Sequence, residues 1–209
     1  MNAQQDNPHN DVPASVEEPK KRPPGMAGRM AGTFLASPIS PPLMIAALAK
    51  AGYVLDNQAY TTAASTAADF ILQNLTADNG RLLKSYRKGK AGSAAPLNDY
   101  AFMVWGLREL YQATYKANYL ADAIALNEQM LSHFWDEQNG GLYITADDGE
   151  KLLVRSKEIY DGAIPSGNSV AVYNLLRLAH MTGKTDYVEK AEGIIKAFSD
   201  PVKQYPAGH

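Results

Sequence analysis

Two aspartates, Asp99 and Asp161, stand just ahead of two apolar segments with helical periodicity, residues 100–114 and 169–182. Two carboxylates on either side of a sugar ring can act as general acid and general base, because burial or mutual repulsion raises the pKa of one of them. We therefore take Asp99 and Asp161 as candidate catalytic residues. A structural alternative for Asp99 is that it, or Asn98, caps the helix by accepting hydrogen bonds from free backbone N–H groups.

A dense polar segment, residues 155–168, leads into the second of these helices. Glycine and proline recur in it, so we predict a loop, and loops on helical scaffolds often bind ligands. Its candidate substrate-binding residues are Arg155, Lys157, Glu158, Tyr160, Ser166 and Asn168. In the structural alternative, its basic residues pair with neighbouring acids such as Asp161, and Ser166 caps the helix.

Four aromatic residues, Tyr100, Trp105, Trp135 and Tyr160, could stack on sugar rings, because each offers a flat apolar face. Packing in the core is the commoner use of aromatic residues at helical spacing. Of the four, Tyr100 and Tyr160 are expected closest to the two aspartates, so we add Tyr100 to the candidate substrate-binding residues.

Other chemistries find little support in the sequence. There is no cysteine, which excludes disulfides, thiolate catalysis and cysteine-ligated metals in this chain. His133 and His180 have no partner at metal-ligand spacing, and no phosphate-binding loop or nucleophile elbow is present. We expect no metal and no cofactor.

The composition is that of a globular protein, with 45% hydrophobic and 20% charged residues among 209. The net charge of -2 gives no reason to expect nucleic acid or an anionic membrane as a partner. The apolar run at residues 43–55 is too short to cross a bilayer, which needs about 20 residues. No targeting segment is recognisable, so we expect a cytoplasmic protein.

The chain divides into a tail, residues 1–42, and one domain, residues 43–209. The tail holds eight of the twelve prolines and few large apolar side chains, so we predict that it is disordered. In the domain, Tyr60, Tyr119 and Tyr187 mark a repeat with spacings of about 60 and about 70 residues. Each tyrosine follows an apolar inner helix and opens an amphipathic outer helix, which predicts three αα-hairpins.

The links between hairpins contain turns such as Asn139-Gly140-Gly141. Residues 142–145 and 152–154, around Asp147-Asp148-Gly149, are predicted to form a short β-hairpin insertion. Repeats near 34 residues would indicate a tetratricopeptide solenoid, whereas these longer repeats favour an all-α fold that forms part of an (α/α)6 toroid. In a toroid the starts of the inner helices converge, so residues just before 100 and just before 169 should meet.

Several motifs resemble the helical region of the thioredoxin-domain-containing, spermatogenesis-associated-protein-like family. They are LMIAALAKA at 43–51, ADFIL at 68–72, GRLLKSYR at 80–87, NDYAF at 98–102, FWDE at 134–137 and KEIYDGAIPSGNS at 157–169. The resemblance implies a six-hairpin toroid akin to N-acylglucosamine 2-epimerases and unsaturated glucuronyl hydrolases. The family's Trp-Asn-Gly before the first inner helix is Ser40-Pro41-Pro42 here, Asn98 replaces a usual Asp, and the thioredoxin-like part is missing, so we expect a fragment of the family's architecture.

Two functions follow from this resemblance. The first is a carbohydrate-handling domain of the epimerase or glycosidase kind with a sugar ligand, inactive if the missing hairpins are required. The second is a helical binding or scaffold module that contacts another protein, or that self-associates through the open half-ring. An incomplete ring exposes inner-helix surface, which promotes association.

Overall fold

The computed structural model describes residues 41–87, 90–149 and 153–204. Three inner helices alternate with three outer helices along the chain. The inner helices are α2 (Pro41–Val54), α4 (Leu97–Thr114) and α6 (Gly167–Thr182). The outer helices are α3 (Gln58–Asn74), α5 (Ala117–Phe134) and α7 (Asp186–Ala197), followed by the short α8 (Ser199–Gln204). The only regular strands of the described residues are β1 (Tyr86–Arg87) and β2 (Lys90–Ala91).

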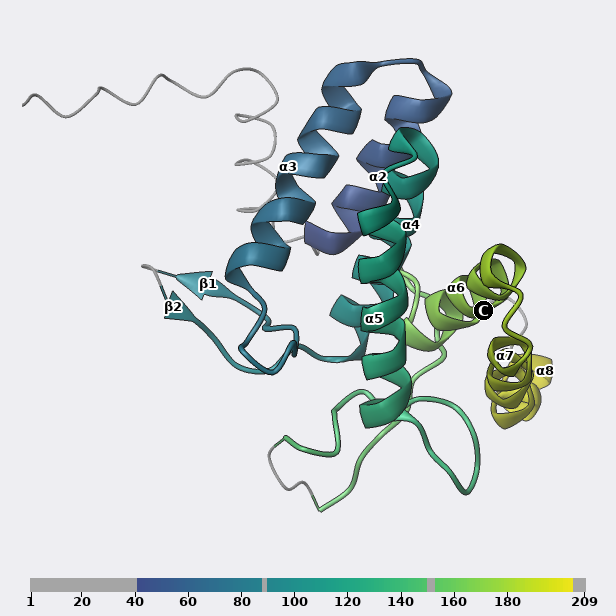
Figure 1. Ribbon diagram of the computed structural model, residues 1–209. Helices are drawn as coiled ribbons and strands as arrows, with labels where there is room; N and C mark the ends of the chain where they lie inside the picture. The colour runs from purple at the N-terminus through teal and green to yellow at the C-terminus, as the bar shows by residue number, and fades with distance from the viewer. Residues whose placement is uncertain (1–40, 88–89, 150–152, 205–209) are drawn as a thin grey trace, which may run out of the picture.

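The helices pair as three αα-hairpins, α2/α3, α4/α5 and α6/α7, as the repeat predicts. Helix α4 is at the centre, because it contacts α2 and α6 within the inner layer and α3 and α5 outside it. Figure 1 shows that the third hairpin is turned relative to the first two, so the layer of hairpins curves. The prediction of an all-α fold is confirmed.

Turn chemistry sets the ends of the helices. The side chain of Asn57 accepts a hydrogen bond from the Ala59 N–H and so caps α3. Gly183 closes α6 in the left-handed conformation, with φ of 74°, which glycine adopts without strain. Helix α4 begins at Leu97, earlier than predicted, so Asp99 lies inside the first turn and Pro96 takes the N-cap position. The expectation that Asn98 or Asp99 caps this helix is wrong.

The core lies between the two layers and is dominated by α4. Phe102, Val104, Leu107 and Leu110 of this helix are buried. Gly106 brings α4 close to α2, because a Cβ at this position would lie 2.9 Å from Cγ2 of Ile45. Helix α4 therefore acts as the support against which the other hairpins are placed.

The irregular links contain the little β structure that is present. The predicted hairpin after residue 142 is only partly formed: Tyr143 pairs with Lys157 as an isolated bridge, and the Ile144 N–H donates to the carbonyl of Ser156 at 2.9 Å. The second segment is thus Ser156–Lys157 and not residues 152–154, of which residue 152 lies outside the described residues. The regular hairpin, β1 with β2, lies in the preceding link.

The predicted tail, residues 1–42, lies outside the described residues except for Pro41 and Pro42, which open α2. Proline suits the first turn of a helix, where its missing N–H is not needed. Within residues 41–87, 90–149 and 153–204, no helix has the length and apolar character to span a bilayer.

Candidate functional site

The starts of the three inner helices meet at one open groove with a volume of about 450 Å³. We call it the mouth groove. It is lined by Pro41, Lys84, Pro96, Asn98, Asp99, Phe102, Glu158, Tyr160, Ile164, Pro165 and Ser166. The sequence argument that residues before 100 and before 169 converge is therefore confirmed.

Helices α4 and α6 begin close together beside the mouth groove. A Cβ at Gly167 would lie 2.5 Å from Oδ1 of Asn98 and 2.7 Å from Cγ of Leu97. Only glycine allows these two helix starts to come so near. This packing places Asp99, in the first turn of α4, in the same groove as Ser166, the N-cap of α6.

Four predicted site residues, Asp99, Glu158, Tyr160 and Ser166, line the mouth groove together. Glu158 and Tyr160 are exposed in the loop that covers one side, and the hydroxyl of Ser166 accepts the Ser169 N–H at 3.1 Å. The groove thus combines two carboxylates, a phenol and a hydroxyl, which are groups that hydrogen-bond to the hydroxyls of a polar ligand.

Asp161 does not line the mouth groove. Its Oδ1 accepts a hydrogen bond from the backbone N–H of Ser166 at 2.8 Å. This contact fastens the loop to the start of α6. The predicted catalytic role of Asp161 stays a prediction, and the structure places its carboxylate against the backbone of Ser166.

Asn168 is fully buried and holds the loop from the other side. Its amide accepts the Leu142 N–H at 2.8 Å and donates to the Leu142 carbonyl at 2.9 Å and to the Glu158 carbonyl at 2.8 Å. The amide has no capacity left for a ligand except one acceptor lone pair. Asn168 therefore fixes the backbone that carries Glu158.

Arg155 and Lys157 also hold the link between α5 and α6. The guanidinium of Arg155 donates to the carbonyls of His133 and Thr145. Nζ of Lys157 lies 2.7 Å from Oδ2 of the buried Asp136. The hydrogen bond from Lys157 keeps the pKa of Asp136 well below its usual range, against the effect of burial.

Tyr100 does not reach the mouth groove. It is fully buried, and its hydroxyl accepts hydrogen bonds from Nε of Arg81 at 3.0 Å and from the Leu82 N–H at 2.8 Å. Its ring packs against Phe134 with 5.3 Å between centroids. The predicted stacking of Tyr100 on a sugar is therefore incompatible with this position, and we leave it out of the site.

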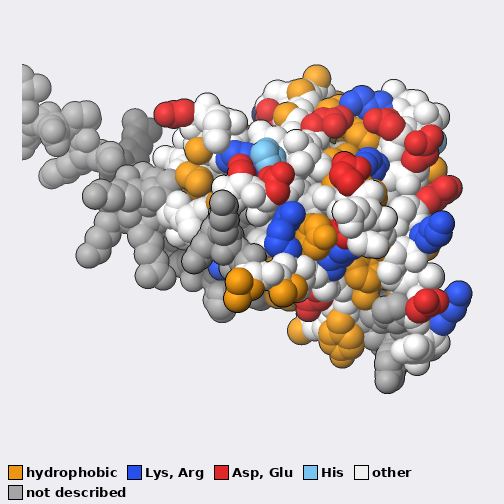
Figure 2. All heavy atoms as spheres, turned by 90° about the horizontal axis from the view of Figure 1, so that it is seen from below, with side chains coloured by type: hydrophobic (Ala, Val, Ile, Leu, Met, Phe, Trp, Pro, Cys, Tyr) orange, Lys and Arg blue, Asp and Glu red, His pale blue; other side chains and the backbone are white. Residues whose placement is uncertain are grey.

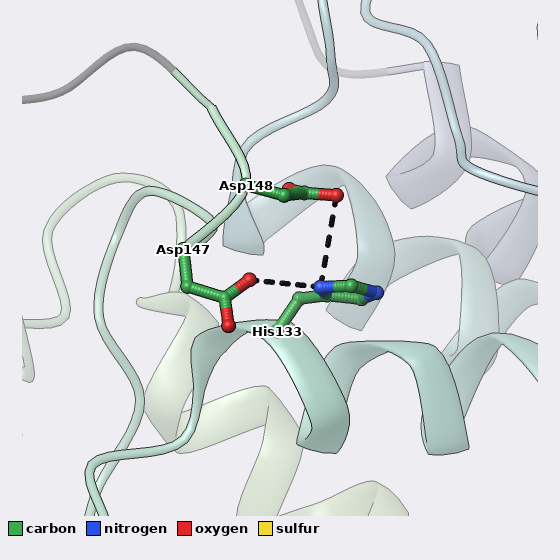
Figure 3. Close-up of side chains that lie close together, drawn as sticks. All are labelled: His133, Asp147 and Asp148. Carbon is green, nitrogen blue, oxygen red and sulfur yellow. Dashed lines mark hydrogen bonds and ion pairs between the residues drawn. The ribbon is translucent and has the colours of Figure 1, made fainter.

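A cluster that spacing arguments missed joins His133 at the end of α5 to Asp147 and Asp148 in the following link (Figure 3). Nδ1 of His133 lies 2.8 Å from Oδ1 of Asp147 and 3.7 Å from Oδ2 of Asp148. The hydrogen bond from His133 lowers the pKa of Asp147. Ligand atoms so close together could hold a cation, but Asp148 already pairs with Arg81. We regard the cluster as an ion-pair network between two links.

The surface on the side of the α5–α6 link carries charges of both signs. Viewed from the side of the α5–α6 link, acidic and basic side chains are interspersed over the face, with orange apolar side chains near the lower edge (Figure 2). No patch of one sign dominates the described residues on this face.

Lys84, Asn98 and Phe102 line the mouth groove but were not among the candidates. Lys84 and Asn98 fall within the GRLLKSYR and NDYAF motifs, which could have pointed to them. Their approach to the loop depends on the packing of α4 against α6, which no local pattern reveals.

Comparison with known proteins agrees with this architecture. No family model matches the chain. The chain is 35% identical to rat spermatogenesis-associated protein 20 and 34% identical to the human protein, in each case over 174 residues. It is a homologue of spermatogenesis-associated protein 20. The matched part makes up 78% of this chain but 22% of each relative, so the chain spans about a fifth of their length.

Solved structures show the fold. Cellobiose 2-epimerase from Spirochaeta thermophila matches with a TM-score of 0.61 and 21% identity, over 75% of this chain and 42% of that chain. A D-mannose isomerase matches with a TM-score of 0.59 and 16% identity, over 76% of this chain and 40% of that chain. The expected partial (α/α)6 toroid is therefore confirmed, and the chain corresponds to less than half of such a ring.

Proposed function

We propose that the mouth groove binds a carbohydrate and that Asp99 is its acid–base residue. The observation that carries the proposal is the meeting of Asp99, Glu158, Tyr160 and Ser166 at the starts of the inner helices. The likeness of the fold to a cellobiose 2-epimerase and a D-mannose isomerase supports a sugar over other polar ligands.

Each side of the mouth groove has a role in this proposal. Asp99 and Glu158 accept hydrogen bonds from sugar hydroxyls, and Asp99 exchanges a proton with the bound sugar. Tyr160, which is exposed, offers a flat apolar face for the C–H side of a ring. Asp161 is a positioning residue, because it fixes Ser166 through the backbone hydrogen bond.

The charges of the mouth groove favour a neutral sugar. Two carboxylates, Asp99 and Glu158, face one ammonium group, that of Lys84. A uronide or a sugar phosphate would bring a further negative charge to a site with no excess of cations, which costs electrostatic energy. We therefore expect a hexose or an N-acylhexosamine to bind better than an unsaturated uronide.

Thermal unfolding with a sugar panel tests the proposal. A neutral sugar at about 100 times its Kd should raise the melting temperature by roughly 5 °C. Asp99→Asn keeps the size of the side chain but removes its charge, and should abolish most of this shift.

The matched control is Glu192→Gln, the same carboxylate-to-amide change at an exposed site on α7, which should leave the shift intact. A panel in which no hexose or N-acylhexosamine stabilises the protein would refute the proposal. An equal loss of the shift in both variants would refute the role of Asp99.

A further inference from the structure

A second groove lies on the inner helices α2, α4 and α6, and we call it the inner-face groove. Its volume of about 440 Å³ is within the range of pockets that hold small ligands, about 300–1,000 Å³. Apart from Lys50 and Glu109, its lining residues are apolar or aromatic. The mouth groove instead carries two carboxylates, an ammonium group and hydroxyls, so the two grooves differ in the chemistry that they offer a ligand.

The two grooves follow one face of α4. Asn98 and Phe102 line the mouth groove, and Trp105 and Glu109 line the inner-face groove. These four positions recur at i, i+4, i+7 and i+11, which places them on one face of a helix. Seven helical residues, from Asn98 to Trp105, rise about 10 Å along the axis, so a ligand of that length would reach from one groove into the other.

Helix α6 connects the grooves in the same way. Ser166, its N-cap, lines the mouth groove, and Tyr173 lines the inner-face groove. The two residues are seven positions apart, about two helical turns, and so lie on one face. Two helices from different hairpins therefore carry polar groups at their starts and an aromatic residue further along the same face.

Trp105 and Tyr173 form an aromatic wall of the inner-face groove. Their rings meet edge to face, with 5.7 Å between centroids. Nε1 of Trp105 donates to Oε1 of Glu109 at 3.2 Å, and the guanidinium carbon of the buried Arg108 lies 4.6 Å from the Tyr173 centroid. Because these contacts orient both rings before a ligand arrives, binding costs little side-chain entropy. Such a wall suits another aromatic ring.

The two charged residues of the inner-face groove pair with each other. Nζ of Lys50 lies 3.6 Å from Oε2 of the buried Glu109. The other oxygen of Glu109 accepts hydrogen bonds from Trp105 and Arg108. A neutral ligand group would leave this network intact, whereas a charged group would compete with it. The inner-face groove therefore favours an uncharged apolar group.

We propose that the inner-face groove holds the aromatic aglycone of a glycoside whose neutral sugar lies in the mouth groove. The inference rests on the sugar site proposed above and adds the class of its ligand, an aryl glycoside. A free monosaccharide would occupy the polar groove alone. An aryl glycoside would also remove from water the apolar surface beside Trp105 and Tyr173, which strengthens binding.

Calorimetric titration of the full chain with matched pairs of glycosides tests this proposal. The probes are the methyl and phenyl glycosides of glucose, mannose, galactose and N-acetylglucosamine, in both anomers. For the sugar that binds, the phenyl glycoside should bind about ten-fold more tightly than the methyl glycoside. This is the effect of burying roughly 55 Å² more apolar surface at about 25 cal/mol per Å².

A variant locates the preference for the phenyl group. Ala47 is exposed and lines the inner-face groove, so Ala47→Asp places a carboxylate there without disturbing the core. The ratio of the two affinities should fall to about two or less, with the methyl glycoside unaffected. Ala125→Asp, the same change at an exposed site on outer helix α5, should keep the ten-fold ratio.

Methyl and phenyl glycosides that bind equally well would overturn this inference and leave the sugar site in the mouth groove standing. A phenyl preference that Ala47→Asp does not reduce would also overturn it. So would sedimentation showing a dimer that Ala47→Asp dissociates, since a second copy would then fill the groove. If no glycoside of either kind bound, the sugar site and this inference would both be refuted.

Discussion

The carboxylate of Asp136 is buried and stays charged because several neighbouring groups donate hydrogen bonds to it. Lys157, the hydroxyl of Tyr143 and the backbone N–H groups of Gln138 and Asn139 all approach its carboxylate. The hydrogen bond to Asp136 in turn raises the pKa of the Tyr143 phenol. This one carboxylate joins the end of α5 to the loop that carries Glu158 and Tyr160.

The pH dependence of stability should reveal this group. The pKa of an unfolded aspartate is about 3.9, and that of Asp136 in the folded chain is lower. The stabilising contribution of Asp136 is therefore present above about pH 4 and is lost as the pH falls below that value. Asp136→Asn should cost about 2 kcal/mol at pH 7 and flatten the fall in the free energy of unfolding below pH 4.

Urea unfolding at several pH values between about 2 and 7 measures this dependence. Glu192→Gln, an exposed carboxylate change on α7, should leave the whole curve unaltered. An Asp136→Asn curve parallel to that of the unmodified chain would show that Asp136 has the same pKa folded and unfolded.

At the scale of elements, the site depends on how α4 and α6 begin. Because a Cβ at Gly167 would collide with Leu97 and Asn98, Gly167→Ala should push the two helix starts apart. We expect a loss of about 1–3 kcal/mol in the free energy of unfolding and a weaker response to the neutral sugar.

The control is Gly149→Ala, where the nearest atom to the added Cβ would be the Ala146 carbonyl oxygen at 3.6 Å. This variant should unfold and respond to sugar like the unmodified chain, as measured by calorimetry with and without ligand. If Gly167→Ala had the same stability and the same sugar response as Gly149→Ala, the close approach of α4 and α6 would not be needed to form the mouth groove.

The helices could be predicted from the sequence because their periodicity and joints are local. Gly183 and the repeated tyrosines fix where hairpins turn, and the structure places those turns as expected. The orientation of Tyr100 could not be predicted, since its hydroxyl meets Arg81, which is distant along the chain. The same holds for His133 and Asp147, whose contact depends on the course of the α5–α6 link.

Across the whole molecule, stability should be uneven, since α4 contacts four other helices whereas α7 packs mainly on α6 and α8. Amide hydrogen exchange should therefore be slowest in α4 and fastest in α7 and α8, because local opening follows the number of packed neighbours. Exchange measured by mass spectrometry on peptic fragments gives this order directly.

Two core truncations sharpen this last prediction. Ile194→Ala removes a buried side chain from α7 and should speed exchange in the third hairpin while α4 stays protected. Leu107→Ala, an equally buried position on α4, should speed exchange in every helix, because it lowers the free energy of global unfolding by about 2–5 kcal/mol. Identical protection of all helices, with both variants acting on the whole chain, would instead mean that the three hairpins open as one unit.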